Sequence, residues 1–166
     1  MIKKLVILAV LAAALRATGL LPFQSSDVAE LVPVQALVVS VEEGKVYLDG
    51  GECLGIGADW DSALQDLKES AEGHVFLGTA DHVVLCGEAV SLLQQLIESE
   101  ALRPAASVCV CPNGLIDSKS AAGYLAAHDG GVTLQQVRAL QLRPGEVELP
   151  ELIRTQGGLR LDAKDR

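Results

Sequence analysis

Four cysteines, Cys53, Cys86, Cys109 and Cys111, are the residues of this chain best suited to nucleophilic or metal chemistry. Cys109 and Cys111 are separated by one residue, so on a strand both side chains would point to the same face. Structural zinc sites usually place two to four residues between paired cysteines, and on a turn. The spacing therefore favours small buried hydrophobic residues and predicts no metal. Whether Cys86 pairs with Cys109 or Cys111 depends on whether their strands are adjacent, so the disulfide state of all four stays open.

Asp81 and His82 offer an acid beside a base. A secreted thiol or hydrolytic enzyme could use His82 with Cys86 or Cys109, provided that a cation or a helix N-terminus lowers the cysteine pKa. However, no Gly-x-Ser-x-Gly motif is present, and neighbouring residues on a strand point to opposite faces. We therefore interpret His82 as a loop or strand-start residue and predict no catalytic residue, with the enzyme as the alternative.

The segment Gly55-Ile56-Gly57 invites comparison with the dinucleotide-binding fingerprint. That fingerprint requires a third glycine three residues after the second, and this position holds Trp60. The bulk of Trp60 would block close helix–strand packing. We therefore interpret the two glycines as turn residues and predict no cofactor.

These candidates lie in or around a strand–helix–strand unit, residues 55–88. Apolar residues recur at helical spacing between Trp60 and Ala71, Asp59 can cap the helix, and Gly73 ends it. An apolar strand, Val83–Cys86, follows. This order predicts two parallel strands in one sheet.

The remaining chain predicts a hairpin at Val34–Leu48 before this unit and more α/β structure after it. We expect a helix at Glu88–Leu102 with Val90 buried, a strand at Ala106–Cys111, a helix at Ser118–His128, and a short helix that begins with a capping box at Thr133. The fold class is thus α/β (α+β): a single domain with a mixed β-sheet, an N-terminal hairpin followed by β-α-β-α-β, and helices packed on the sheet.

The N-terminus predicts export. Lys3 and Lys4 precede an apolar run, Leu5–Leu15, and the small residues 17–19 suit a signal peptidase. An uncleaved anchor is the alternative, so whether the leader is cleaved stays open. The chain of 166 residues has a net charge of −9, which disfavours binding to nucleic acid and anionic lipid.

The central segment also resembles the N-terminal domain of the spore germination Ger(x)C (GerAC-like) lipoproteins. The matching residues, in order, are Gly55, Gly57, Ala63, Leu64, Leu67, Phe76, Leu77, Gly78, Val83, Val84, Leu85, Gly87 and Glu88. The chain departs from the family because it lacks the lipobox cysteine and ends where a second domain would begin. The resemblance divides the chain into a signal peptide or anchor (1–24), an α/β domain (25–142) and a linker-like tail (143–166), whose last sixteen residues we expect to be disordered.

The resemblance implies a non-enzymatic, extracytoplasmic accessory subunit of a spore germinant receptor. Its partners would be integral membrane subunits, and it would be membrane-associated, or secreted if the leader is cleaved. The connection between Phe76 and His82 is our candidate contact surface, with Thr79, Asp81 and His82 as contacts, because loops commonly carry binding residues. The germinant, the oligomeric state and whether this short form is functional are not evident from the sequence.

Overall fold

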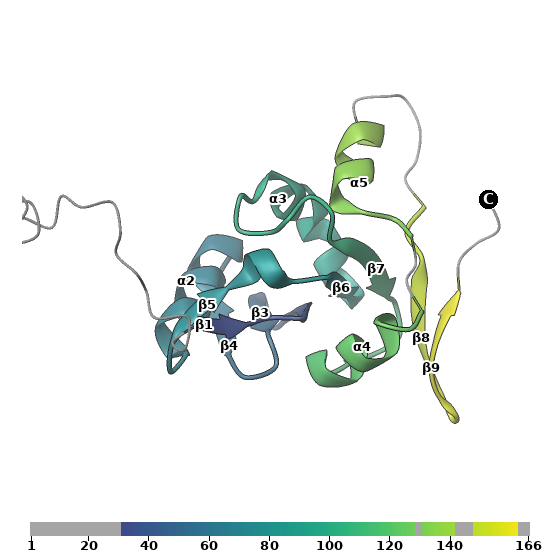
Figure 1. Ribbon diagram of the computed structural model, residues 1–166, viewed down its shortest axis with the longest axis horizontal. Coiled ribbons are helices and arrows are strands. Elements are labelled where there is room, and N and C mark those ends of the chain that lie inside the picture. Colours follow the sequence, from purple (N-terminus) through teal and green to yellow (C-terminus); the bar gives the residue numbers. More distant parts are fainter. Residues whose placement is uncertain (1–30, 129–130, 142–147, 163–166) are drawn as a thin grey trace, which may run out of the picture. The chain divides into compact units, whose positions relative to one another are not determined.

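The computed structural model describes residues 31–128, 131–141 and 148–162. The expected leader, residues 1–24, lies outside them. Within them, seven strands form one mixed sheet in the order β4-β3-β2-β6-β7-β8-β9, and two short strands, β1 and β5, pair separately (Figure 1). The strands of the large sheet are β2 (Ala36–Glu42), β3 (Lys45–Asp49), β4 (Leu54–Gly57), β6 (His82–Cys86), β7 (Ser107–Cys111), β8 (Glu151–Thr155) and β9 (Gly158–Asp162).

The expected hairpin is confirmed as β2 and β3, which pair antiparallel around a turn at Glu43 and Gly44. Both turn residues have positive φ angles, 50° and 74°. Such a two-residue turn matches the right-handed twist of the strands that it joins. Strands β2, β6 and β7 are mutually parallel, and β4 is antiparallel to β3. Strand β4 therefore runs parallel to β6, as predicted, although β3 and β2 lie between them.

Helices cover both faces of the sheet. Helices α2 (Trp60–Ser70), α3 (Leu93–Glu98) and α5 (Leu134–Gln141) pack on one face, in a core that includes Leu37, Leu85 and Val108. Helix α4 (Ser118–Leu125) packs on the opposite face, where its buried residues Ala121, Ala122 and Leu125 match the prediction. The alternation of side chains along each strand separates the two cores.

Helix α2 begins as its sequence predicts. Asp59 accepts a hydrogen bond from the backbone N–H of Ser62, and the Ser62 hydroxyl lies 3.1 Å from the Asp59 backbone nitrogen, which completes a capping box. The helix ends at Ser70, three residues before Gly73. A capping box also opens α5, where Thr133 and Gln136 bond reciprocally.

Our interpretation of Gly55 and Gly57 as turn residues is wrong. A Cβ atom on Gly55 would lie 2.2 Å from the carbonyl oxygen of Ala63, and one on Gly57 would lie 2.2 Å from the Ala63 nitrogen. The glycines therefore allow the backbone of α2 to contact β4 directly. Trp60, which we expected to block such packing, is buried at the start of the helix.

The expected helix at Glu88–Leu102 is mostly absent. A 3₁₀ helix, Gly87–Leu92, precedes the short α3, and Val90 is 42% exposed instead of buried. Gly87 has a φ of 54°, a conformation that glycine adopts without strain and that ends β6 sharply. Within α3, Leu96 and Ile97 are buried.

The prediction of a disordered tail is wrong for residues 151–162. Strands β8 and β9 form a hairpin that extends the sheet beside β7 (Figure 1). Leu152 of β8 is fully buried against the core that contains α4. The remainder of the predicted tail, residues 143–147 and 163–166, lies outside the described residues.

The α/β fold class with its mixed sheet is confirmed. The described residues form one compact unit. None of the described helices is long and apolar enough to cross a membrane.

Candidate functional site

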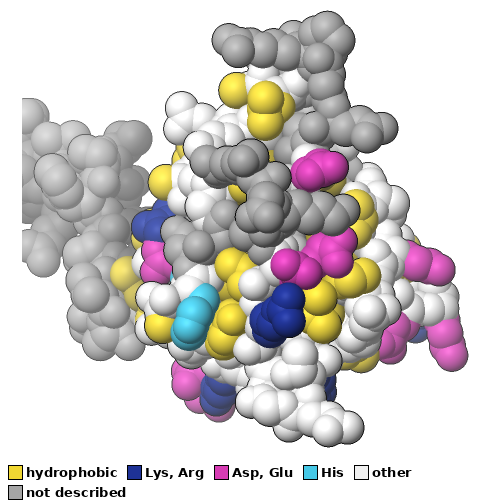
Figure 2. All heavy atoms as spheres, turned by 90° about the vertical axis from the view of Figure 1, so that its right-hand side faces the viewer, with side chains coloured by type: hydrophobic (Ala, Val, Ile, Leu, Met, Phe, Trp, Pro, Cys, Tyr) yellow, Lys and Arg dark blue, Asp and Glu magenta, His cyan; other side chains and the backbone are white. Residues whose placement is uncertain are grey.

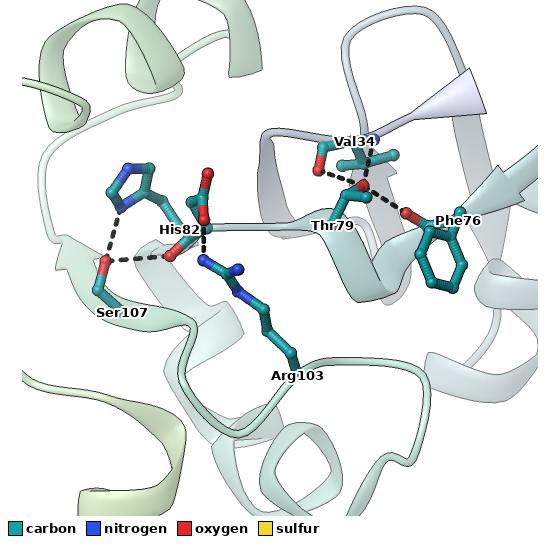
Figure 3. Close-up of polar contacts among 7 residues, drawn as sticks. Val34, Phe76, Thr79, His82, Arg103 and Ser107 are labelled. Atoms are coloured by element: carbon teal, nitrogen blue, oxygen red, sulfur yellow. Dashed lines mark hydrogen bonds and ion pairs between the residues drawn. The ribbon is translucent and has the colours of Figure 1, made fainter. Parts of the chain in front are cut away.

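Thr79, the first candidate contact, joins two segments inside the domain (Figure 3). Its hydroxyl accepts a hydrogen bond from the backbone N–H of Val34 at 3.1 Å and lies 2.7 Å from the carbonyl oxygen of Phe76. Thr79 ends a short 3₁₀ turn, Leu77–Thr79, after β5 (His74–Phe76). Its polar group is therefore used to hold β5 beside β1 (Leu31–Pro33), which pairs with it in parallel.

Asp81, the second candidate, is half exposed and forms an ion pair with Arg103 (Figure 3). Its backbone is fixed on both sides. The Asp81 N–H donates to the carbonyl of Gln35 at 2.8 Å, and its carbonyl accepts from the Ser107 N–H at 2.8 Å. The ion pair thus links the start of β6 to the segment before β7, and the carboxylate remains within reach of solvent.

His82, the third candidate, is the first residue of β6 and is 9% exposed. Its Nδ1 atom lies 2.7 Å from the hydroxyl of Ser107, the first residue of β7. That hydroxyl is also 3.4 Å from the carbonyl oxygen of Asp81. The prediction of a strand-start residue is confirmed, and both side chains of the pair are buried in the sheet.

A hydroxyl hydrogen-bonded to an imidazole is the first half of a nucleophile–base arrangement. The Asp81 carboxylate, however, pairs with Arg103, and neighbouring strand residues point to opposite faces. The Asp81 carbonyl lies 3.4 Å from the Ser107 hydroxyl of this dyad. The geometry therefore suits a structural bond between β6 and β7 better than the activation of Ser107.

The cysteines lie in apolar surroundings. Burial raises the pKa of Cys86 to about 11, and burial is also the main cause that raises the pKa of Cys53 and Cys111. The thiolate is the reactive form, so a raised pKa lowers reactivity at neutral pH. His82 and Cys86 are four residues apart on one strand, which separates them by about 13 Å. No group of three metal-ligating side chains that could hold a metal occurs among the described residues.

Sequence reasoning missed a groove on the sheet face that carries α4. It has a volume of about 390 Å³ and runs over β2, β3 and β4 to the loop before α4. Leu54 of β4 and Leu115 of the loop are 50% and 52% exposed there, and Ile56, beside Tyr47 in the sheet, is 40% exposed. We call this surface the sheet groove; its lining residues are Val38, Ser40, Glu42, Tyr47, Asp49, Leu54, Leu115, Ile116, Asp117 and Arg154.

The charged residues of the sheet groove are mainly acidic. Glu42, Asp49 and Asp117 line it with one basic residue, Arg154. Asp49 is also structural, because it accepts hydrogen bonds from the backbone N–H and hydroxyl of Ser118 at 3.0 and 2.8 Å. Figure 2 shows one face of the molecule, on the side of β8 and β9, where hydrophobic side chains lie between carboxylates that outnumber basic groups. The alternation of Leu54 and Ile56 with glycine along β4 gave no signal for this groove, because which face of the sheet a helix covers is a tertiary property.

In comparisons with known proteins, no family model, no curated protein and no solved structure matches this chain.

Proposed function

We propose that this protein is a non-enzymatic, extracytoplasmic accessory subunit that acts by contact with an integral membrane partner. The sheet groove carries the proposal. Scattered apolar residues are normal on protein surfaces, whereas a group of them lining a concavity is typical of an interaction site. Leu54 and Leu115 line the sheet groove with Tyr47, and the exposed Ile56 lies beside Tyr47 in the sheet. Its acidic rim favours a partner surface that combines apolar with basic side chains.

The resemblance to the spore germination Ger(x)C proteins supplies the class of partner in this proposal, a germinant-receptor membrane subunit. The expected leader supplies the location, outside the cytoplasm and at the membrane. The class of partner and the location are argued independently of the sheet groove, so each needs its own test.

The environments of the reactive groups support contact over chemistry. Cys86 is buried with a raised pKa, and His82 and Ser107 bond to each other inside the sheet. A thiol or hydrolytic enzyme would need these groups to face a substrate. Of the loop residues Thr79, Asp81 and His82, only Asp81 presents a half-exposed charged group, so we retain it as a secondary contact.

The proposal is tested by affinity purification of the tagged full chain from detergent-solubilised membranes of its native host. We expect Leu54→Asp to abolish recovery of an integral membrane partner, because a charge would be placed in the apolar contact. Leu140→Asp is the matched control: Leu140 is 44% exposed on α5, which packs on the opposite sheet face. Asp81→Asn tests the loop.

Equal recovery with Leu54→Asp and Leu140→Asp would reject the sheet groove as the contact surface. Failure of the wild-type protein to recover any integral membrane protein would reject the accessory-subunit proposal. Circular dichroism of each variant verifies that the fold is intact.

Export is tested by fusing residues 1–24 to a reporter that is active only outside the cytoplasm. An inactive, cytosolic fusion would reject the proposed location. A mature N-terminus at Leu20, found by mass spectrometry, would distinguish a cleaved leader from an anchor.

A further inference from the structure

Cys86 and Cys111 occupy matching positions at the ends of two neighbouring strands. Cys86 is the last residue of β6 and Cys111 the last of β7, and the two are partners in the parallel register. Both side chains belong to the core on the α4 face, with 3% and 0% exposure. Each thiol influences the pKa of the other.

We propose that Cys86 and Cys111 form a site for a reversible disulfide that joins β6 to β7. Neighbouring strands lie about 4.8 Å apart, which falls within the Cα separation of about 4.4–6.8 Å that a disulfide spans. Both residues end their strands, where Gly87 and Pro112 follow, so the sheet constrains their backbones less than it would in mid-strand.

The other two thiols are excluded by position. Cys109 is in register with Val84, and its thiol lies 3.9 Å from the carbonyl oxygen of Val83. Cys53 belongs to the core on the opposite face of the sheet. The structure thus selects one of the pairings that the sequence left open.

The bond would form by thiol–disulfide exchange with a low-molecular-weight disulfide. The thiolate of one cysteine attacks the reagent, giving a mixed disulfide and releasing one reagent thiolate. The second cysteine, as thiolate, attacks the protein sulfur of the mixed disulfide and releases the other reagent thiolate. Two electrons pass to the reagent, which is reduced to two thiols, and the two cysteine protons are taken up by the released thiolates or by solvent.

Burial makes the thiols of Cys86 and Cys111 slow to react in the folded protein. It raises the pKa of both thiols, although backbone N–H groups of Ile116 and Asn113 partly oppose this. Exchange therefore requires that the segment 112–117 opens, or that the bond forms while the chain folds.

The test uses the full-length protein refolded in a glutathione buffer that contains excess oxidised glutathione. Thiols are then trapped with N-ethylmaleimide in denaturant and counted by intact-mass spectrometry. We expect two of the four thiols to be unreactive in the wild type, and all four to react after treatment with dithiothreitol. Cys53→Ser and Cys109→Ser should each keep the bond, whereas Cys111→Ser should lose it.

Four reactive thiols in the oxidised wild-type protein would overturn the proposal, and so would a bond that persists in Cys111→Ser. A wild-type count of four reactive thiols overturns the proposal even if a serine variant fails to fold. This experiment needs no partner and no export, so its outcome is independent of the proposed function.

Discussion

Gly55→Ala should detach helix α2 from the edge of the sheet. The new methyl group would lie 2.2 Å from the carbonyl oxygen of Ala63, and 2.6 and 2.7 Å from the Cβ and nitrogen of Leu67. Two of these three atoms are backbone, so no side-chain rotation relieves the clash. Restoring ordinary contact, at 3.4 Å, moves the helix by about 1.2 Å.

That displacement breaks the polar contacts between α2 and β4. The Asp66 carboxylate accepts from the Ile56 N–H at 2.8 Å, and the Ser70 hydroxyl donates to the Leu54 carbonyl at 2.8 Å. Each hydrogen bond contributes about 0.5–1.5 kcal/mol. Overpacking adds about 1–3 kcal/mol. We therefore expect Gly55→Ala to lower the free energy of unfolding by about 2–5 kcal/mol, because the lower entropy of the unfolded Ala chain offsets part of the loss.

Urea unfolding, followed by circular dichroism at equilibrium, measures this loss. With a slope of about 2 kcal/mol per molar urea, the midpoint should fall by about 1–2.5 M. Gly123→Ala is the control with the opposite sign, because an added Cβ there meets nothing within 4 Å in the middle of α4. It should stabilise the protein by about 0.5–1 kcal/mol. A Gly55→Ala midpoint equal to that of the wild type would refute the direct helix–strand contact.

Three further predictions concern the core and the caps. Leu152→Ala should lower the free energy of unfolding by about 2–5 kcal/mol in the same assay, since Leu152 is fully buried, and a negligible loss would show that the terminal hairpin does not pack. Leu67→Ala should lower the free energy of unfolding by a similar amount, because Leu67 is buried, whereas Lys68→Ala should change it little, because Lys68 is exposed. Equal effects of the two substitutions would contradict the orientation of α2. Hydrogen bonds from Ser side chains and N–H groups lower the pKa of the capping residues Asp59 and Asp117 below 3.8. The contribution of the two carboxylates to the free energy of unfolding is therefore present above pH 3.8 and is lost as the pH falls through their pKa in the folded protein. Urea midpoints between about pH 5 and 2 should fall less in an Asp59→Asn, Asp117→Asn variant than in the wild type.

The elements that the sequence predicted well have strong local signals. Helix α2 has an Asp cap and an apolar face, the β2–β3 hairpin has a turn at Glu43-Gly44, and α5 begins with a capping box. Each of these depends on residues within one or two turns of each other, which a single sequence displays.

The elements that it missed depend on tertiary contacts. Val90 has the spacing of a buried helical residue, but Gly87 diverts the chain into a 3₁₀ helix and Val90 is left exposed. Residues 151–162 have too little apolar surface to fold alone, and they become strands because β7 offers an edge to pair with. The same reason applies to the candidate site: Ser107, the partner of His82, is 25 residues away, and only the parallel register of β6 and β7 brings them together.

The two edges of the large sheet are both partly closed, which bears on where a partner would bind. At β4, side chains of Asp66 and Ser70 bond the outer backbone groups of Ile56 and Leu54. At β9, the outer N–H of Leu161 donates to the hydroxyl of Tyr124 at 2.9 Å. Edge strands that are capped in this way are poor templates for adding a strand. Within the described residues, contact through the exposed apolar face of the sheet groove is therefore favoured over strand addition, and this is why Leu54→Asp, which alters the face of β4 and not its backbone, is the informative variant.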